Sequence, residues 1–189
     1  MSPPVGVVAV RLGKVCPVGD MYEVVLAMDI RADVTDDELA ELLWHVGQGP
    51  QPERLTMGTD NFLGTRPLGD PNDPDCEWDT DEPAPVFDQR GVGWKIGGAL
   101  VVELVRRQKP DGWSLTVRQE FHPDSFYQLR ALLDWLGPHS VNANVGDIPF
   151  FVGYMRFYEE AEITPLVLLN GRIGLPEAIE SHTPHWQGA

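Results

Sequence analysis

Cysteine, long apolar runs and secretory features are scarce in this 189-residue sequence. Two cysteines, Cys16 and Cys76, are too few for a disulfide framework, so we expect a reducing, cytoplasmic environment. The opening residues lack the basic start and long apolar centre of a secretory signal, and no apolar run is long enough to span a bilayer. We therefore expect a soluble protein with no membrane partner.

Basic residues are also scarce, since 14 lysines and arginines face 29 aspartates and glutamates, a formal net charge of −15. A surface of that sign repels phosphate backbones, which argues against a nucleic-acid partner. We consider three other partners: a basic protein, a small molecule, and a second copy of the chain in a homodimer. Acidity that only keeps the protein soluble is the alternative explanation.

Motifs that would name a reaction are absent. The sequence contains no GxSxG, Walker A or GxGxxG pattern, and neither cysteine belongs to a CxxC pair. The five histidines do not follow a metal-ligand spacing, and His182 and His185 have no obvious third ligand. We predict no metal and no cofactor, and we favour a protein that is not an enzyme.

Two segments with one layout are present, residues 35–47 and 125–137, ninety positions apart. Each has leucines at spacings of three and four, which predicts an amphipathic helix with one face to bury. Each begins with a capping-box pattern and ends on a glycine suited to a left-handed C-terminal residue: Thr35 with Glu38 and Gly47, and Ser125 with Gln128 and Gly137.

Runs rich in β-branched and aromatic residues predict strands around these helices. The predicted strands are residues 5–15, 22–30, 94–106, 113–121, 150–158 and 165–173, the last with a tight turn at Asn170-Gly171. Strands 5–15 and 22–30 would form a hairpin, as would 94–106 and 113–121. The predicted fold class is α+β: internally duplicated β-hairpin–helix–strand units with pseudo-twofold symmetry, in which antiparallel sheets carry both helices on one face.

The duplication divides one compact domain into two halves. Residues 1–92 form the first half, including an acidic loop at 69–88, residues 93–175 form the second, and 176–189 form a C-terminal tail. The acidic loop has eight acids and four prolines without a basic residue, so we expect a surface loop that cannot pack on its own. A groove between the halves is the expected place for a ligand.

The acidic loop is a candidate partner-binding segment. An apolar ring, Trp78, lies among acids that occupy every second position: Asp73, Asp75, Glu77, Asp79 and Asp81. Oxygen ligands at this spacing suit calcium, but the glycine and terminal glutamate of an EF-hand loop are missing. A solvated loop is the simpler explanation, and docking onto a basic partner is the third.

Candidates for catalysis lie where a predicted strand meets the second helix. His122 is close in sequence to Glu120 and Asp124, so a carboxylate could hold it as a general base, with Arg118 as a further polar anchor. The alternative is that His122-Pro123-Asp124 is only a strand-to-helix turn, and that the charged residues form cross-strand ion pairs.

Aromatic residues are the remaining signal. Four of them could line the groove between the halves, namely Trp44, Trp113, Trp135 and Tyr154, although core packing explains the same periodicity. We predict a non-enzymatic binding protein of accessory or regulatory type, whose acidic surface recognises a protein partner. The alternative is a small-molecule-binding protein or enzyme with its site in the groove between the repeats.

Overall fold

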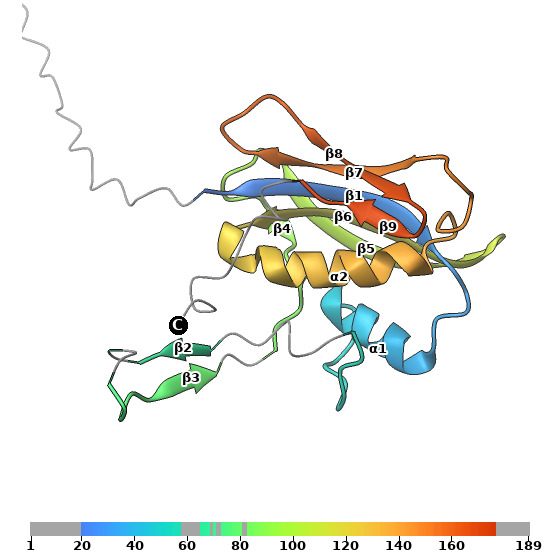
Figure 1. Cartoon of the computed structure of the whole chain (residues 1–189). Coiled ribbons are helices and arrows are strands. Elements are labelled where there is room, and N and C mark those ends of the chain that lie inside the picture. The colour runs from blue at the N-terminus through green and yellow to red at the C-terminus, as the bar shows by residue number, and fades with distance from the viewer. Residues whose placement is uncertain (1–19, 58–64, 69, 71–72, 81–82, 177–189) are drawn as a thin grey trace, which may run out of the picture.

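A computed structural model describes residues 20–57, 65–68, 70, 73–80 and 83–176 and has an α+β fold. Seven antiparallel strands form one sheet in the order β4-β5-β6-β1-β7-β8-β9, and two strands, β2 and β3, form a separate sheet (Figure 1). The elements are β1 (Tyr22–Ile30), α1 (Asp36–His45), β2 (Thr65–Pro67), β3 (Trp78–Thr80), β4 (Gly91–Val92), β5 (Ala99–Gln108), β6 (Asp111–Phe121), α2 (Phe126–His139), β7 (Phe150–Phe157), β8 (Thr164–Leu169) and β9 (Arg172–Gly174).

Strand β1 occupies the centre of the large sheet. It pairs with β6 along its whole length, from Tyr22↔Phe121 to Ile30↔Trp113, and with β7 from Tyr22 to Leu26. The predicted hairpin between residues 5–15 and β1 is therefore wrong over Tyr22–Leu26, because strands from later in the chain occupy both edges. Residues 5–15 themselves lie outside the described residues.

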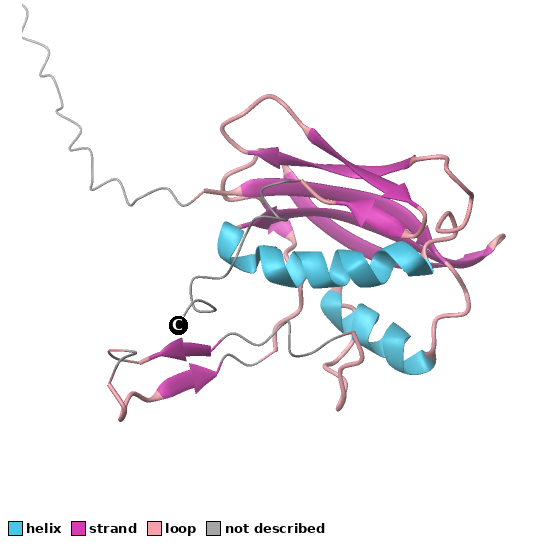
Figure 2. Cartoon of the chain, in the orientation of Figure 1, coloured by secondary structure: helices cyan, strands magenta, loops and turns pink. Residues whose placement is uncertain are grey.

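One face of the sheet and both helices enclose the hydrophobic core. Even-numbered residues of β1, from Val24 to Ile30, are buried on this face together with the leucine stripe of α2. Leu42 and Val46 place α1 against the same core, so both helices lie on one side of the sheet (Figure 2). We call the opposite side the outer face. It carries the exposed side chains of Ala27, Val101, Glu103, Val105 and Thr116.

Helix α1 begins and ends as its sequence predicts. The Thr35 hydroxyl accepts the Glu38 N–H at 3.3 Å, and the Glu38 carboxylate accepts the Thr35 N–H at 3.0 Å, which completes the capping box. Gly47 follows the helix with φ +61°. The positive φ is the reason that glycine stands here.

Helix α2 departs from its prediction at both ends. Ser125 makes no side-chain capping bond, because a 3-10 turn at Pro123–Ser125 precedes the helix and His122 caps that turn instead. The helix also continues past Gly137 and Pro138 to His139. Gly137 is required for close packing, since a Cβ there would lie 2.5 Å from the carbonyl oxygen of Gly171 in the β8–β9 turn.

Two strand and loop predictions also need correction. The predicted strand 94–106 begins only at Ala99, and residues 94–98 form a loop. The predicted surface loop 69–88 contains β3, which pairs with β2 through Arg66↔Asp79, and it ends in Val86 and Phe87, which are buried in the core. In contrast, β7 and the β8–β9 hairpin with its Asn170-Gly171 turn are confirmed. Within the described ranges, no helix has the length and apolarity needed to cross a membrane.

Candidate interaction surface

A short loop between β4 and β5, residues 93–98, has a closed geometry and is called the Trp94 loop below. The Gly93 N–H donates to the Gly98 carbonyl at 3.0 Å, which joins the two ends of the loop. A Cβ at Gly93 would lie 2.5 Å from the Ile96 carbonyl oxygen, so only glycine fits there. The two ends of the loop are therefore held together by a hydrogen bond within its own backbone.

Glu120, on β6, anchors this loop from the outer face of the sheet. Its carboxylate accepts three backbone N–H groups, from Trp94 at 3.0 Å, Lys95 at 2.6 Å and Ile96 at 2.9 Å. Burial raises the pKa of this 5% exposed side chain, but the three donors and the Arg118 guanidinium outweigh burial and hold the pKa below its ordinary value. Glu120 is consequently a charged structural anchor at neutral pH.

Arg118 fixes the far end of the same loop. Its Nη2 donates to the Gly97 carbonyl at 2.7 Å, and its Nη1 donates to the Ala99 carbonyl at 2.6 Å. Arg118 also contacts one oxygen of Glu23, which is 3% exposed, while Arg156 donates to the other oxygen. This buried carboxylate between two guanidiniums holds β6, β1 and β7 together at one place.

The Trp94 loop presents apolar side chains to solvent although its backbone is fixed. Trp94 is 75% exposed, and Val92, just before the loop, is 88% exposed. The Lys95 ammonium lies 4.3 Å from the centre of the Trp94 ring and 5.8 Å from that of Tyr158, within cation–π range. We call the side chains of Val92, Trp94 and Lys95 the Trp94 surface.

The three catalytic candidates are not assembled into one site. Glu120 and Arg118 both serve the Trp94 loop, whereas the His122 ring accepts the Asp124 N–H at 3.3 Å and lies 3.0 Å from the Asp124 carboxylate. Within the described residues His122 makes no hydrogen bond or ion pair with Glu120 or Arg118. Its position matches the strand-to-helix turn that was the alternative explanation.

The four aromatic groove candidates are dispersed over four elements. Trp44 on α1 is buried beside His45, and Trp113 on β6 lies under Arg106, whose guanidinium carbon is 5.2 Å from the ring centre. Trp135 on α2 stacks on His139 and donates to Glu38, whereas Tyr154 on β7 lies across from Val25 of β1. None of the four lines either of the two pockets considered below.

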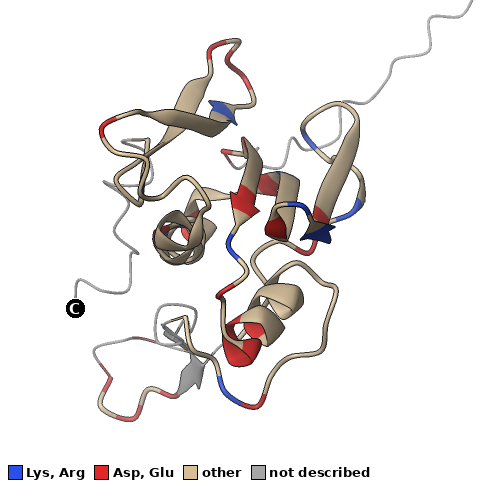
Figure 3. Cartoon of the chain, turned by 90° about the vertical axis from the view of Figure 1, so that its right-hand side faces the viewer, with Lys and Arg blue, Asp and Glu red and all other residues tan. Residues whose placement is uncertain are grey.

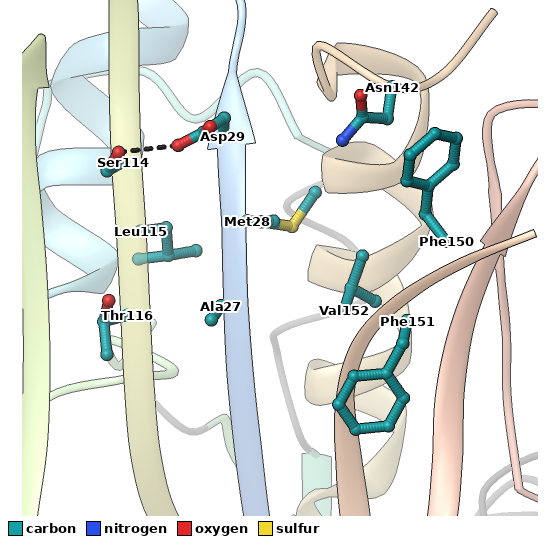
Figure 4. A pocket seen from close by; sticks show the side chains of 10 residues that line it. All are labelled: Ala27, Met28, Asp29, Ser114, Leu115, Thr116, Asn142, Phe150, Phe151 and Val152. Carbon is teal, nitrogen blue, oxygen red and sulfur yellow. Dashed lines mark hydrogen bonds between the residues drawn. The ribbon is translucent and has the colours of Figure 1, made fainter. Parts of the chain in front are cut away.

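A pocket of about 280 Å³ opens between β1 and β7, one strand from each predicted half (Figure 4). On the edge of β1 that faces β7, strand pairing ends at Leu26↔Gly153, next to an irregularity in β7. The same edge is bridged again only at Ile30↔Ser140, which leaves the space for the pocket. Its lining mixes polar and apolar side chains: Asp29, Ser114, Thr116 and Asn142, with Ala27, Met28, Leu115, Phe150, Phe151 and Val152.

Two of the four polar side chains that line this β1–β7 pocket, Ser114 and Asp29, are hydrogen-bonded to each other. The Ser114 hydroxyl donates to the Asp29 carboxylate at 2.6 Å, and the other carboxylate oxygen pairs with Arg107. No histidine is among the described lining residues, and the group that accepts the Ser114 hydroxyl is the Asp29 carboxylate. The Asp29 carboxylate thus links β1 to Ser114 of β6 and to Arg107 of β5 at one side of the pocket.

The acidic partner-binding candidates are only partly described. Asp73, Asp75 and Glu77 are exposed, with the Asp75 N–H donating to the Asp73 carboxylate at 2.9 Å in a local turn. Trp78 and Asp79 belong to β3, and Asp81 lies outside the described residues. Across the described part of the chain, no group of three or more histidine, cysteine, aspartate or glutamate side chains could hold a metal ion.

Helix α1 carries a fully buried polar pair that was not predicted from the sequence, Glu41 and His45. Glu41 accepts the Thr56 hydroxyl at 2.8 Å and the Met57 N–H, and it lies 3.7 Å from the His45 Nε2 atom. Burial raises the Glu41 pKa, but these hydrogen bonds outweigh burial and lower it. The spacing of four between the two residues on the core-facing side of a predicted helix was the signal that could have found them.

Comparisons of the chain with protein-family models, with curated proteins and with solved structures found no match.

Proposed function

We propose that this chain is a non-enzymatic interaction protein that recognises a basic protein partner through the Trp94 surface. One observation carries the proposal: an exposed tryptophan stands on a loop whose backbone is fixed by a buried carboxylate and an arginine. Tryptophan is among the residues that most often dominate binding energy in protein interfaces.

The fixed loop backbone favours binding because little backbone freedom remains to be lost. Ordering a flexible loop on binding would cost free energy, whereas the three bonds to Glu120 have already ordered residues 94–96. A partner with an apolar slot would bury Trp94 and Val92 together. Lys95 would remain at the rim above the tryptophan ring.

The charge of the molecule supports a basic partner. Acidic residues are spread over strands, helices and loops, and basic residues are few (Figure 3). A net charge of −15 would accelerate encounter with a positively charged protein and slow encounter with acidic ones. We therefore expect association to slow as ionic strength rises.

Site-specific photocrosslinking in native cells tests the proposal. A benzophenone amino acid replaces Trp94, and the control places it at Ile148, which is 59% exposed. We expect a discrete protein adduct from position 94 alone. With that partner purified, Trp94→Ala should weaken binding by at least about tenfold, whereas Ile148→Ala should not change it. Identical adducts from both positions, or equal affinities, would contradict the proposal.

The β1–β7 pocket favours a second candidate function, binding of a small molecule that has both polar and apolar groups. We retain here the proposal that the chain is internally duplicated, since this pocket lies between strands from the two halves. A fragment screen by NMR would test the pocket, with Ala27→Phe to obstruct it. Hits should shift the amides of Ala27, Thr116 and Val152 and be lost in the variant. Hits that leave these amides unshifted would contradict this candidate.

A further inference from the structure

A second pocket, of about 430 Å³, lies where the β7–β8 hairpin passes the start of β1. We call it the β7–β8 pocket. Its lining combines apolar and charged side chains: Tyr22, Met155, Phe157, Ile163 and Pro176, with Arg156, Glu160, Glu162 and Thr164. It shares no residue with the Trp94 surface or with the β1–β7 pocket. Its volume is in the range of small-molecule sites.

The apolar side of this pocket includes a pair of aromatic rings. The centres of the Tyr22 and Phe157 rings are 5.2 Å apart and the ring planes are inclined by 42°. Such rings attract a cation placed over their faces, and the attraction strengthens where water is partly excluded. Ile163, which is 51% exposed at the pocket, adds an apolar surface for an uncharged ligand body.

The charges around the pocket leave an excess of carboxylates. Among the described lining residues, the two carboxylates of Glu160 and Glu162 outnumber the one cation, Arg156. The Arg156 guanidinium is held in place by Glu23, to which it donates from Nε and Nη2 at 3.0 and 2.8 Å. Glu160 and Glu162 form no ion pair with any described residue, and Arg156 reaches only the Glu160 backbone carbonyl. Burial raises the Tyr22 pKa, and the Asp20 and Glu160 carboxylates raise it further, which indicates a negative potential at the phenol.

We propose that the β7–β8 pocket binds an organic ammonium group carried on an apolar body. The ammonium would lie between the Glu160 and Glu162 carboxylates and the aromatic pair, and the apolar body would contact Ile163 and Met155. Anionic ligands are disfavoured because the free charges in the lining are negative. The site is separate from the proposed function, so either can fail without the other.

Titration of the isotope-labelled full chain by NMR tests this site with three probes of similar shape. The probes are phenethylammonium, the neutral 3-phenylpropan-1-ol and the anionic 3-phenylpropanoate. We expect phenethylammonium to shift the amides of Tyr22, Phe157 and Thr164, the alcohol to bind at least about fivefold more weakly, and the carboxylate not to bind. Equal binding of alcohol and ammonium would overturn the proposal.

Matched variants separate a built site from general attraction to an acidic protein. Glu160→Gln and Glu162→Gln should each weaken phenethylammonium by about threefold, whereas Glu103→Gln, at an exposed site on β5, should leave it unchanged. An equal loss of affinity in all three variants would show only nonspecific attraction and would also overturn the proposed site.

Nα-acetyl-lysine methylamide serves as a fourth probe. Tighter binding of this probe than of phenethylammonium would assign the ammonium to a lysine side chain, and weaker binding would assign it to a free amine.

Discussion

Glu120 is a buried carboxylate whose three backbone donors all belong to the Trp94 loop. Glu120→Gln replaces one accepting oxygen by an amide that donates, so some N–H groups lose their acceptor. We expect a loss of about 2 kcal/mol in the free energy of unfolding. We also expect faster hydrogen exchange at the amides of Lys95 and Ile96. Denaturant unfolding measures the change in stability, and hydrogen-exchange mass spectrometry measures the exchange of these amides.

The control for this change is Glu103→Gln, an exposed carboxylate on β5. It should alter stability by less than about 0.5 kcal/mol. If exchange in residues 94–96 is the same in wild type and Glu120→Gln, the carboxylate does not order the loop.

Gly137 is a helical glycine whose replacement sets two effects against each other. Alanine favours a helix by about 1 kcal/mol, but the added Cβ would lie 2.5 Å from the Gly171 carbonyl oxygen, a backbone atom that cannot easily move. Overpacking of this kind costs about 1–3 kcal/mol, so we expect Gly137→Ala to be destabilising in thermal unfolding. Gly97→Ala is the control, since nothing lies within 4 Å of that Cβ. If Gly137→Ala is more stable than the wild type, the β8–β9 turn moves enough to accommodate the added Cβ.

Strand β5 is an edge strand for most of its length, because β4 pairs only with Ala99 and Leu100. The Gln48 side chain covers this edge by accepting the Leu104 N–H at 2.8 Å and donating to the Leu104 carbonyl at 3.3 Å. Arg90 donates to the Val102 carbonyl in the same way. Exposed edges promote pairing between molecules, and these side chains block it.

Removing the cover should therefore promote self-association through β5. We expect Gln48→Ala to form concentration-dependent dimers or larger species in analytical ultracentrifugation, whereas Gln51→Ala, at another exposed glutamine, should resemble wild type. If the Gln48→Ala variant stays monomeric at high concentration, Arg90 and the strand twist are enough to prevent pairing between molecules along β5.

Elements whose specification is local were predictable from the sequence. The α1 capping box involves residues three apart, and the Asn170-Gly171 turn adopts the positive φ values its residues favour, 50° and 73°. The ends of α2 were not predictable, because the close approach of Gly137 to the β8–β9 turn depends on a segment more than thirty residues later. The neighbours of β1 were missed for the same reason, since both β6 and β7 are distant in sequence.

In the candidate sites too, contacts that depend on segments distant in sequence were not predictable. Arg118 and Glu120 are candidates because they lie close to His122 in the sequence, but the sequence does not indicate that their partners are the backbone groups of the Trp94 loop. The apolar run predicts a strand through Trp94, whereas the structure has a loop there, and the flanking glycines are the signal of that loop. Glu23 was not considered, since only the fold brings two arginines to it.

The molecule as a whole carries a net charge of −15, so its folded state is under electrostatic self-repulsion at neutral pH. Salt screens such repulsion between exposed charges over about 10 Å at 0.1 M ionic strength. The buried ion pairs of Glu23 are screened much less. Added salt should therefore stabilise this protein, in contrast to a protein whose surface is rich in paired charges.

We expect the melting temperature at pH 7 to rise with sodium chloride, and to rise less at pH 5, where repulsion is weaker. Below about pH 4.5 the melting temperature should fall, because folding lowers the pKa values of three carboxyls, those of Glu38, Glu41 and Glu120. Their contribution is present above the ordinary value of 4.5 and is lost as the pH falls from there through the folded values. Calorimetry between about pH 3 and pH 8 at two salt concentrations measures both effects. A melting temperature that falls with salt at pH 7 would show that attractive surface pairs outweigh the net charge.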